Sequence, residues 1–249
     1  MQLALITALG VGGSTIIGVL FGFLFQKIPH EFNDIVLSYA AGIMLGAAVL
    51  GLIIPSLDEG NVWITLLGIL IGAFFLNFAD KITPHLHHIT GIDQEKHSDK
   101  QSQLNKVMLF VMAIAIHNLP EGIAAGVGFG TEDIANAITV ALGIALQNVP
   151  EGMVIVSPLI LAGVPKIRVL FIACFTGIVE VIGTMIGFFA VNIAAAILPF
   201  ALAFAGGTML YVISDEMIPE THSHGYERQA TYALLFGFMT MILMDHYIG

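Results

Sequence analysis

Two similar six-residue motifs hold the side chains best suited to chemistry in this sequence. HNLPEG stands at residues 117–122, and QNVPEG stands at residues 147–152. Residues three and four apart share one face of a helix, so each motif would point its amide or imidazole and its carboxylate the same way. Mixed imidazole, carboxylate and amide ligands suit zinc, iron, manganese or cadmium, whereas calcium and magnesium prefer all-oxygen shells. The motifs therefore indicate a site for a divalent transition-metal ion.

A further carboxylate, Glu180, follows in the next apolar segment and completes the candidate set. The candidate metal ligands are His117, Asn118, Glu121, Gln147, Asn148, Glu151 and Glu180. Glu121 and Glu151 each stand after a proline, and each could bridge two ions.

The elements that must position these residues are membrane-spanning helices. Of the 249 residues 57% are hydrophobic and only 10% are charged, whereas soluble domains are about a quarter charged. A spanning helix needs about 20 apolar residues. Charges, Gly and Pro divide the chain into segments near 3–25, 33–56, 62–81, 105–128, 134–161, 167–191, 198–219 and 230–248. The prediction is an all-α integral membrane protein with eight transmembrane helices.

The basic residues give the orientation. With eight spans, all eight Lys and Arg residues fall on one side of the membrane. The positive-inside rule makes that side the cytoplasm, so both termini are expected to be extracytoplasmic and the protein to be multi-pass in the cell (inner, cytoplasmic) membrane. We expect residues 1–249 to form a single transmembrane transporter domain, with one long cytoplasmic, His-containing loop at about 82–104. The single cysteine allows no disulfide within the chain, and no nucleic-acid partner is expected.

Internal symmetry predicts how the helices are arranged. Ala-Gly at 41–42 recurs at 205–206, and Ile-Pro at 54–55 recurs at 218–219. The two recurrences have the same offset along the chain, because 205 − 41 equals 218 − 54. The two central motifs lie in consecutive spans that run in opposite directions. Three helices, a central pair and three more helices would make an inverted repeat, as in many secondary transporters.

The motifs lie near the bilayer midplane. From Lys106 to His117 is eleven residues, about 16 Å at helical rise. Ionised carboxylates at that depth cost about 2.5 kcal/mol or more each unless they are paired or line a cavity, and a bound cation would offset this cost. A single intramembrane His or Asn can instead serve helix packing. The repetition of the motif together with Glu180 favours the ion site.

A second group of carboxylates and histidines lies toward the predicted cytoplasmic side. It comprises Asp80, His85, His87, Asp215, Glu216 and Glu220. Successive weak ligands would let a tightly held ion leave in steps, so these residues are interpreted as an exit path, with the histidine loop receiving the metal. Ordinary solvated helix ends remain the alternative.

The two motifs followed by Glu180 resemble the ZIP family of metal transporters, and in particular its GufA-like branch. The resemblance implies that the seven candidate ligands form a binuclear transport site, that zinc or a similar divalent ion is the transported substrate with no other cofactor, and that the protein moves it into the cytoplasm, commonly as a homodimer. Many zinc carriers of the family have a second histidine where this sequence has Gln147, which leaves the metal preference open.

Two other classes of protein fit part of this pattern. A membrane-embedded zinc metalloenzyme would use HExxH, in which two histidines flank a glutamate base, and this pattern does not occur in the sequence. A proton-coupled transporter of an organic solute would use the carboxylates as a proton relay. Since the predicted spans place no Lys or Arg beside the motifs to meet an anion, a cation is the expected substrate and the protein is expected not to be an enzyme.

Overall fold

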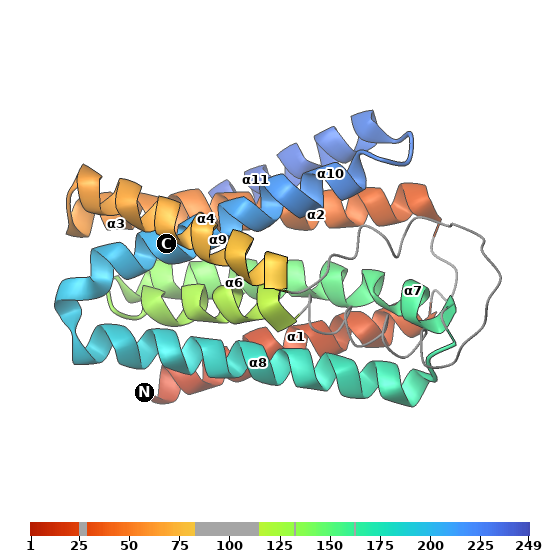
Figure 1. The fold of residues 1–249 in the computed structure, drawn as a ribbon, viewed down its shortest axis with the longest axis horizontal. Helices are drawn as coiled ribbons and strands as arrows, with labels where there is room; N and C mark the ends of the chain where they lie inside the picture. The colour runs from red at the N-terminus through yellow and green to blue at the C-terminus, as the bar shows by residue number, and fades with distance from the viewer. Residues whose placement is uncertain (25–28, 83–114, 132, 162) are drawn as a thin grey trace.

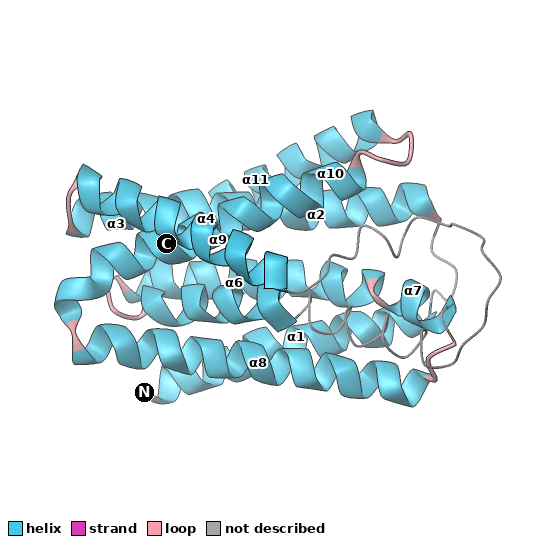
Figure 2. Ribbon diagram, viewed as in Figure 1, coloured by secondary structure: helices cyan, strands magenta, loops and turns pink. Residues whose placement is uncertain are grey.

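The computed structural model describes residues 1–24, 29–82, 115–131, 133–161 and 163–249, and every regular element in these ranges is helical (Figure 2). The α-helices are α1 (Gln2–Leu24), α2 (His30–Ala48), α3 (Ile54–Glu59), α4 (Val62–Ile82), the helix of residues 115–128, α6 (Ile134–Val154), α7 (Val156–Leu161), α8 (Lys166–Ile193), α9 (Leu198–Val212), α10 (Ile218–Thr221) and α11 (Glu227–Ile248). Short π-helical segments, η1 (Val49–Ile53) and η4 (Ile213–Met217), join α2 to α3 and α9 to α10, and a 3₁₀ turn, η3 (Ala195–Ile197), precedes α9.

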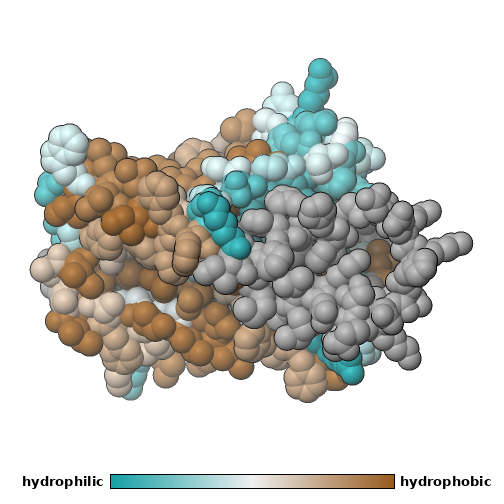
Figure 3. Space-filling model, viewed as in Figure 1, coloured by the Kyte–Doolittle hydropathy of each residue, from teal (hydrophilic) through white to brown (hydrophobic). Residues whose placement is uncertain are grey.

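Seven helical segments of the described chain are long and apolar enough to cross a membrane. They are Gln2–Leu24, His30–Glu59, Val62–Ala79, Ile134–Leu161, Lys166–Ile193, Leu198–Thr221 and Glu227–Ile248. Each agrees within a few residues with a span predicted from the sequence. The predicted fourth span, 105–128, begins outside the described residues, and its described part is helical from residue 115. The all-helical, multi-pass prediction is therefore confirmed, and apolar residues cover much of the face in Figure 3.

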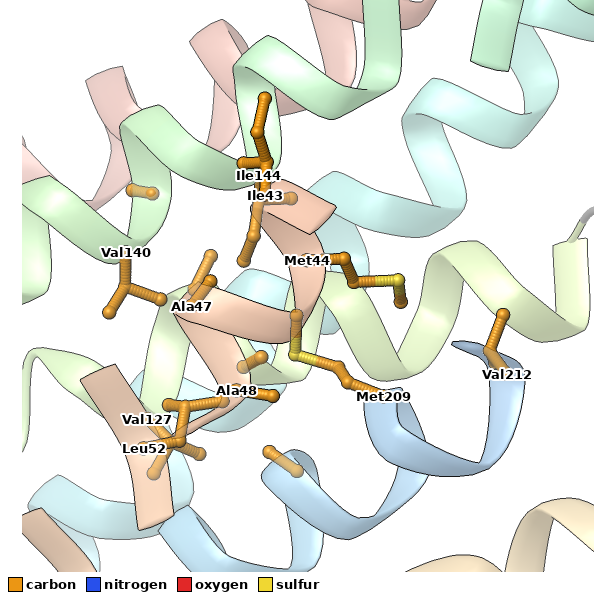
Figure 4. Close-up of a cluster of buried hydrophobic side chains, with 14 of the residues drawn as sticks. Ile43, Met44, Ala47, Ala48, Leu52, Val127, Val140, Ile144, Met209 and Val212 are labelled. Carbon is orange, nitrogen blue, oxygen red and sulfur yellow. The ribbon is translucent and has the colours of Figure 1, made fainter. Parts of the chain in front are cut away.

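Helix α2 lies at the centre of the packing. It contacts α11, α6 and α9, while α4 packs on α9, and α1 packs on both α6 and α8. Figure 1 shows these helices running roughly alongside one another. The largest buried cluster gathers around α2 and η1, where Ile43 and Met44 of α2 and Leu52 of η1 meet side chains of α6 and α9 (Figure 4).

Glycines let helix backbones approach closely. A Cβ atom added to Gly42 of α2 would lie 1.9 Å from the carbonyl oxygen of Leu234, and one added to Gly237 of α11 would lie 2.0 Å from that of Tyr39. Lipid supplies no hydrophobic force that drives helices together, so this close van der Waals packing is a main source of association.

The two π-helical segments stand at equivalent places in the two halves of the chain. Segment η1 spans 49–53 and η4 spans 213–217, so they are separated by the same offset as the repeated dipeptides, because 213 − 49 equals 205 − 41. Each precedes a helix whose second residue is proline, Pro55 or Pro219. Proline has no amide hydrogen and crowds the carbonyl four residues earlier, which disfavours a regular α-helix at that point. In η1 the carbonyl in question, that of Gly51, accepts a hydrogen bond from Asn136 Nδ2 at 3.2 Å.

The ends of the bundle differ in charge. The starts of α2, α8 and α11 lie at one end of the molecule, and the α3–α4 turn and the α8–α9 connection lie at the other (Figure 1). Lys166 and Arg168 begin α8, and Arg228 stands in the first turn of α11. These basic residues therefore share one end.

Candidate metal site

The two motifs place most of their polar side chains in the protein interior. Five of the seven candidate ligands are buried, namely Asn118, Glu121, Gln147, Asn148 and Glu180, and the other two, His117 and Glu151, are half-buried. Glu121 is 1% exposed and Glu180 is fully buried. Carboxylates buried this deeply within membrane-spanning helices require a compensating positive charge or proton.

The last residue of each motif explains how the carboxylates come together. A Cβ atom added to Gly122 would lie 2.2 Å from the carbonyl oxygen of Glu180, and one added to Gly152 would lie 2.3 Å from that of Thr15. The helix of residues 115–128 therefore lies directly against α8, and α6 lies directly against α1. The first of these contacts brings Glu121 beside Glu180.

Glu180 is held by amide side chains. Asn148 Nδ2 donates a hydrogen bond to Glu180 Oε1 at 2.5 Å and is also 3.3 Å from the carbonyl oxygen of Val11. Asn118 lies beside the same carboxylate. The second oxygen of Glu180, Oε2, has no hydrogen-bond partner among the described residues. The carboxylate is thus oriented by its neighbours, with one oxygen available for an ion.

Three carboxylates form a single electrostatic cluster. Glu121 lies within electrostatic range of both Glu151 and Glu180, and the side chain of Gln147 lies beside Glu121. Neither amide atom of Gln147, nor Glu121 Oε2, makes a well-formed hydrogen bond within the described chain. Among the described residues no Lys or Arg is buried to balance these charges. Mutual repulsion and lost hydration both oppose a triply ionised cluster, and a divalent cation would relieve both.

The remaining motif residue, His117, meets a residue of the predicted exit path. His117 Nε2 lies 2.9 Å from Oε1 of Glu216 in η4. Adjacent ligands of a tetrahedral zinc ion, with bond lengths near 2.0–2.1 Å, stand about 3.3 Å apart. Glu151 lies within electrostatic range of both residues. The structure therefore places Glu216 with the central group, and the π-helical turn that carries it could not be recognised from α-helical periodicity.

The side chains as they stand do not enclose an ion with acidic and histidine ligands alone. In the described ranges, no group of three His, Cys, Asp or Glu residues is close enough to hold a metal. The arrangement instead offers the His117–Glu216 pair, the Glu121–Glu180 pair and amide oxygens between them. Small side-chain movements and amide or water oxygens would be needed to complete a shell.

The other exit-path residues are less informative. His85 and His87 lie outside the described residues, as does the side chain of Asp80. Asp215 is exposed on η4, and Glu220 is half-buried on α10.

Comparison with known proteins identifies the family. Residues 87–245, which include both motifs and Glu180, match the ZIP zinc transporter family. The chain belongs to the ZIP zinc transporter family. It is 41% identical to zinc transporter GufA of Myxococcus xanthus over 73% of this chain and 70% of that protein. It is 34% identical to zinc transporter ZIPB of Bordetella bronchiseptica over 95% of this chain and 78% of that protein. Zinc transporter ZIP11 of Xenopus tropicalis is 30% identical over 95% of this chain and 94% of its own length.

Membership of the ZIP family confirms the resemblance drawn from the two motifs. These relatives are transporters and not enzymes, so the metalloenzyme alternative is set aside. This ZIP protein is a multi-pass membrane protein, and the matched region includes every helix that contributes a candidate ligand.

Proposed function

We propose that this ZIP protein carries divalent transition-metal ions, zinc first among them, into the cytoplasm across the cell (inner, cytoplasmic) membrane. The observation that carries the proposal is the cluster formed by the buried Glu121 and Glu180 with the half-buried Glu151 among the spanning helices. The relatives are named as zinc transporters, which supports the choice of substrate. Iron, manganese and cadmium stay within the expected range of substrates, because Gln147 takes the place of a second histidine.

The depth of the cluster supports a transport site. Helix α8 runs for 28 residues from Lys166 to Ile193, and Glu180 stands almost equally far from its two ends. At helical rise each half of this helix is about 20 Å long, so Glu180 lies at the middle of its span. An ion bound there has membrane on both sides, as alternating access to a central site requires.

The cluster has enough candidate ligands to bind two ions. His117 and Glu216 would serve one position, and Glu121, Glu180 and amide oxygens of Asn118, Gln147 and Asn148 would serve the other. Glu151 lies within electrostatic range of residues from both groups. A carboxylate in that position is suited to bridge two ions, so we assign Glu151 the bridging role, with Glu121 as the second candidate for it.

The proposal includes the architecture expected for such a carrier. Residues 1–249 would form one domain of eight spans in a 3+2+3 inverted repeat, with both termini extracytoplasmic, and the protein would act as a homodimer. The equal offset of η1 and η4 supports the repeat. So do the two motif glycines, because Gly122 packs on α8 and Gly152 packs on α1, which would be equivalent first helices of the two outer groups.

Purified protein in liposomes that contain a zinc-sensitive dye would test the function. We expect zinc entry by the wild type and none by Glu121→Ala or Glu151→Ala, with all three proteins incorporated equally. Near-normal entry in both variants would refute the assignment of the site. A wild-type protein that moves protons with an organic solute but no metal would instead favour the proton-coupled alternative.

A further inference from the structure

A second polar group lies on α2, away from the two motifs. His30, Asp34 and Ser38 are spaced four residues apart and so share one face of the helix. Asp34 and Ser38 are both fully buried, although Asp34 stands only one turn after the start of α2. A carboxylate so close to a helix end could reach water at little cost, and its complete burial therefore requires an explanation.

The buried carboxylate is only half satisfied. Its Oδ1 atom lies 3.0 Å from Nδ1 of His224, in the connection between α10 and α11. The ring of His30 stacks on that of His224, with centroids 4.7 Å apart. In the described chain neither Asp34 Oδ2 nor Ser38 Oγ has a hydrogen-bond partner. A buried polar atom left unpaired is destabilising, and a charged one more so, which indicates that this pocket is arranged for something more than the His224 contact.

We propose that Asp34 and His224 form a second binding site for the transported divalent ion, separate from the central cluster. The inference rests on the proposed function, since it concerns the same cargo. The 3.0 Å separation of His224 Nδ1 and Asp34 Oδ1 is close to the distance of about 3.3 Å between adjacent ligands of a tetrahedral zinc ion. Asp34 Oδ2 and Ser38 Oγ supply further oxygen atoms beside the pair.

The ligands of this site are suited to an intermediate binding site from which an ion is released. It offers one carboxylate and one imidazole as strong ligands, and water would have to complete the shell. Such a shell binds more weakly than one with three or four protein ligands. Multi-site passage requires sites that bind strongly enough to receive an ion and weakly enough to let it leave.

The position along the chain connects the two sites. Glu216, which contacts His117, precedes His224 by eight residues, and the intervening η4 and α10 both pack against α2. The chain is helical from Glu216 to Thr221, which covers about 7.5 Å, and His224 follows three residues later in the connection. An ion that leaves the His117–Glu216 pair would therefore meet Asp34 and His224 next. In the proposed orientation this step leads toward the cytoplasm.

The neighbouring His222 provides a matched comparison. Its Nδ1 lies 2.9 Å from the carbonyl oxygen of Ile218, and its Nε2 lies 3.1 Å from Thr231 Oγ1. Both ring nitrogens are therefore used at 3.1 Å or less, whereas Nε2 of His224 has only a 3.3 Å contact with Oγ of the adjacent Ser223. We assign His222 to the structure of the connection and His224 to the ion.

Zinc binding to purified protein, counted by equilibrium dialysis, would test the site. The histidine loop would bind zinc as well, so the starting protein should carry Ala at residues 85, 87, 88 and 97. We expect Asp34→Asn and His224→Gln each to lose one zinc ion per chain from this protein, and His222→Gln to lose none. Adding Glu121→Ala and Glu151→Ala should remove central binding and leave the Asp34–His224 site intact, which separates failure of this inference from failure of the proposed function.

A ligand exchange distinguishes metal binding from a simple hydrogen bond. We expect His224→Cys to bind cadmium with the ultraviolet absorption of a cadmium–thiolate bond, beyond any contribution of Cys174 in the parent protein. Monodisperse elution of each variant on size exclusion would confirm that it is folded. Unchanged zinc stoichiometry in Asp34→Asn and His224→Gln, or a His224→Cys protein without the thiolate absorption, would overturn the proposal.

Discussion

His117 Nε2 lies 2.9 Å from Glu216 Oε1, so a residue of the repeated motif contacts a carboxylate on a π-helical turn in the opposite half of the chain. The spacing approaches that of two ligands on one tetrahedral ion. The contact joins the central cluster to the segment that leads toward α10. If the cluster holds the ion in transit, Glu216 is the residue at which the central ligand set ends and the route to the cytoplasm begins.

Glu216→Gln should lower the initial rate of zinc entry into liposomes by about 10-fold or more. The amide keeps the size of the side chain but removes the negative charge that faces His117, and loss of groups that support a metal ligand costs about 10–100-fold. Glu227→Gln, an exposed position in the first turn of α11, should leave the rate unchanged. Equal rates in Glu216→Gln and the wild type would remove Glu216 from the transport route.

Glu180→Gln should reduce the number of zinc ions bound at the central site from two toward one. Gln is the same size, but it removes the charge that holds the second ion, and only the oxygen of its amide can accept the hydrogen bond from Asn148. The measurement is zinc stoichiometry by equilibrium dialysis, together with the rate of zinc entry. If neither changes, Glu180 serves helix packing and the site holds its ions without it.

The membrane spans could be predicted from the sequence because a helix that crosses lipid requires a long run of apolar residues. Most boundaries of the described spans fall where charged residues, Gly or Pro interrupt about 20 apolar residues, as at Lys166 of α8. The two motifs also fix, through helical spacing, which helix face carries Glu121 and which carries Glu151.

Contacts between distant helices could not be predicted in the same way. Helical periodicity assumes 3.6 residues per turn, whereas the π-helical turn η4 changes which side chains face the interior. The sequence therefore assigns Glu216 only to the exit path and not to the central group of ligands. The sequence does not identify Asp34 as a binding residue, because it lies at the edge of a predicted span, where charged residues are ordinarily solvated. The four-residue spacing of His30, Asp34 and Ser38 is the available signal, although its partner His224 becomes apparent only from the fold.

The histidine loop lies outside the described residues, and its role stays a prediction. Neutral imidazole binds metal and imidazolium does not, so zinc bound by the loop should be released as the pH falls through about 6.5. Zinc titrations at about pH 7.5 and pH 5.5 would measure this on the wild type and on a variant with Ala at residues 85, 87, 88 and 97. The same number of zinc ions on both proteins at the higher pH would exclude the loop as a receiver of the metal.

Gly122→Ala should damage both the packing and the metal site. The added Cβ would lie 2.2 Å from the carbonyl oxygen of Glu180, and because that atom belongs to the backbone of α8, the two helices must separate. Overpacking of this kind costs about 1–3 kcal/mol. The separation would also move Glu121 away from Glu180, and a displacement of about 1 Å at a reacting site can lower a rate by about 100-fold.

Gly128→Ala is the matched control on the same helix. There the added Cβ would lie 3.4 Å from the Cα atom of Ala137, which is an ordinary van der Waals contact. Gly128 is the last residue of this helix, where the mid-helix advantage of alanine over glycine does not apply in full, so this variant should be about as stable as the wild type. In thermal unfolding in detergent, only Gly122→Ala should therefore unfold at a lower temperature than the wild type, and only Gly122→Ala should lose zinc entry and one or both bound ions. If Gly122→Ala retained the wild-type unfolding temperature and zinc stoichiometry, the close approach of the helix of residues 115–128 to α8 would not be what positions Glu121 beside Glu180.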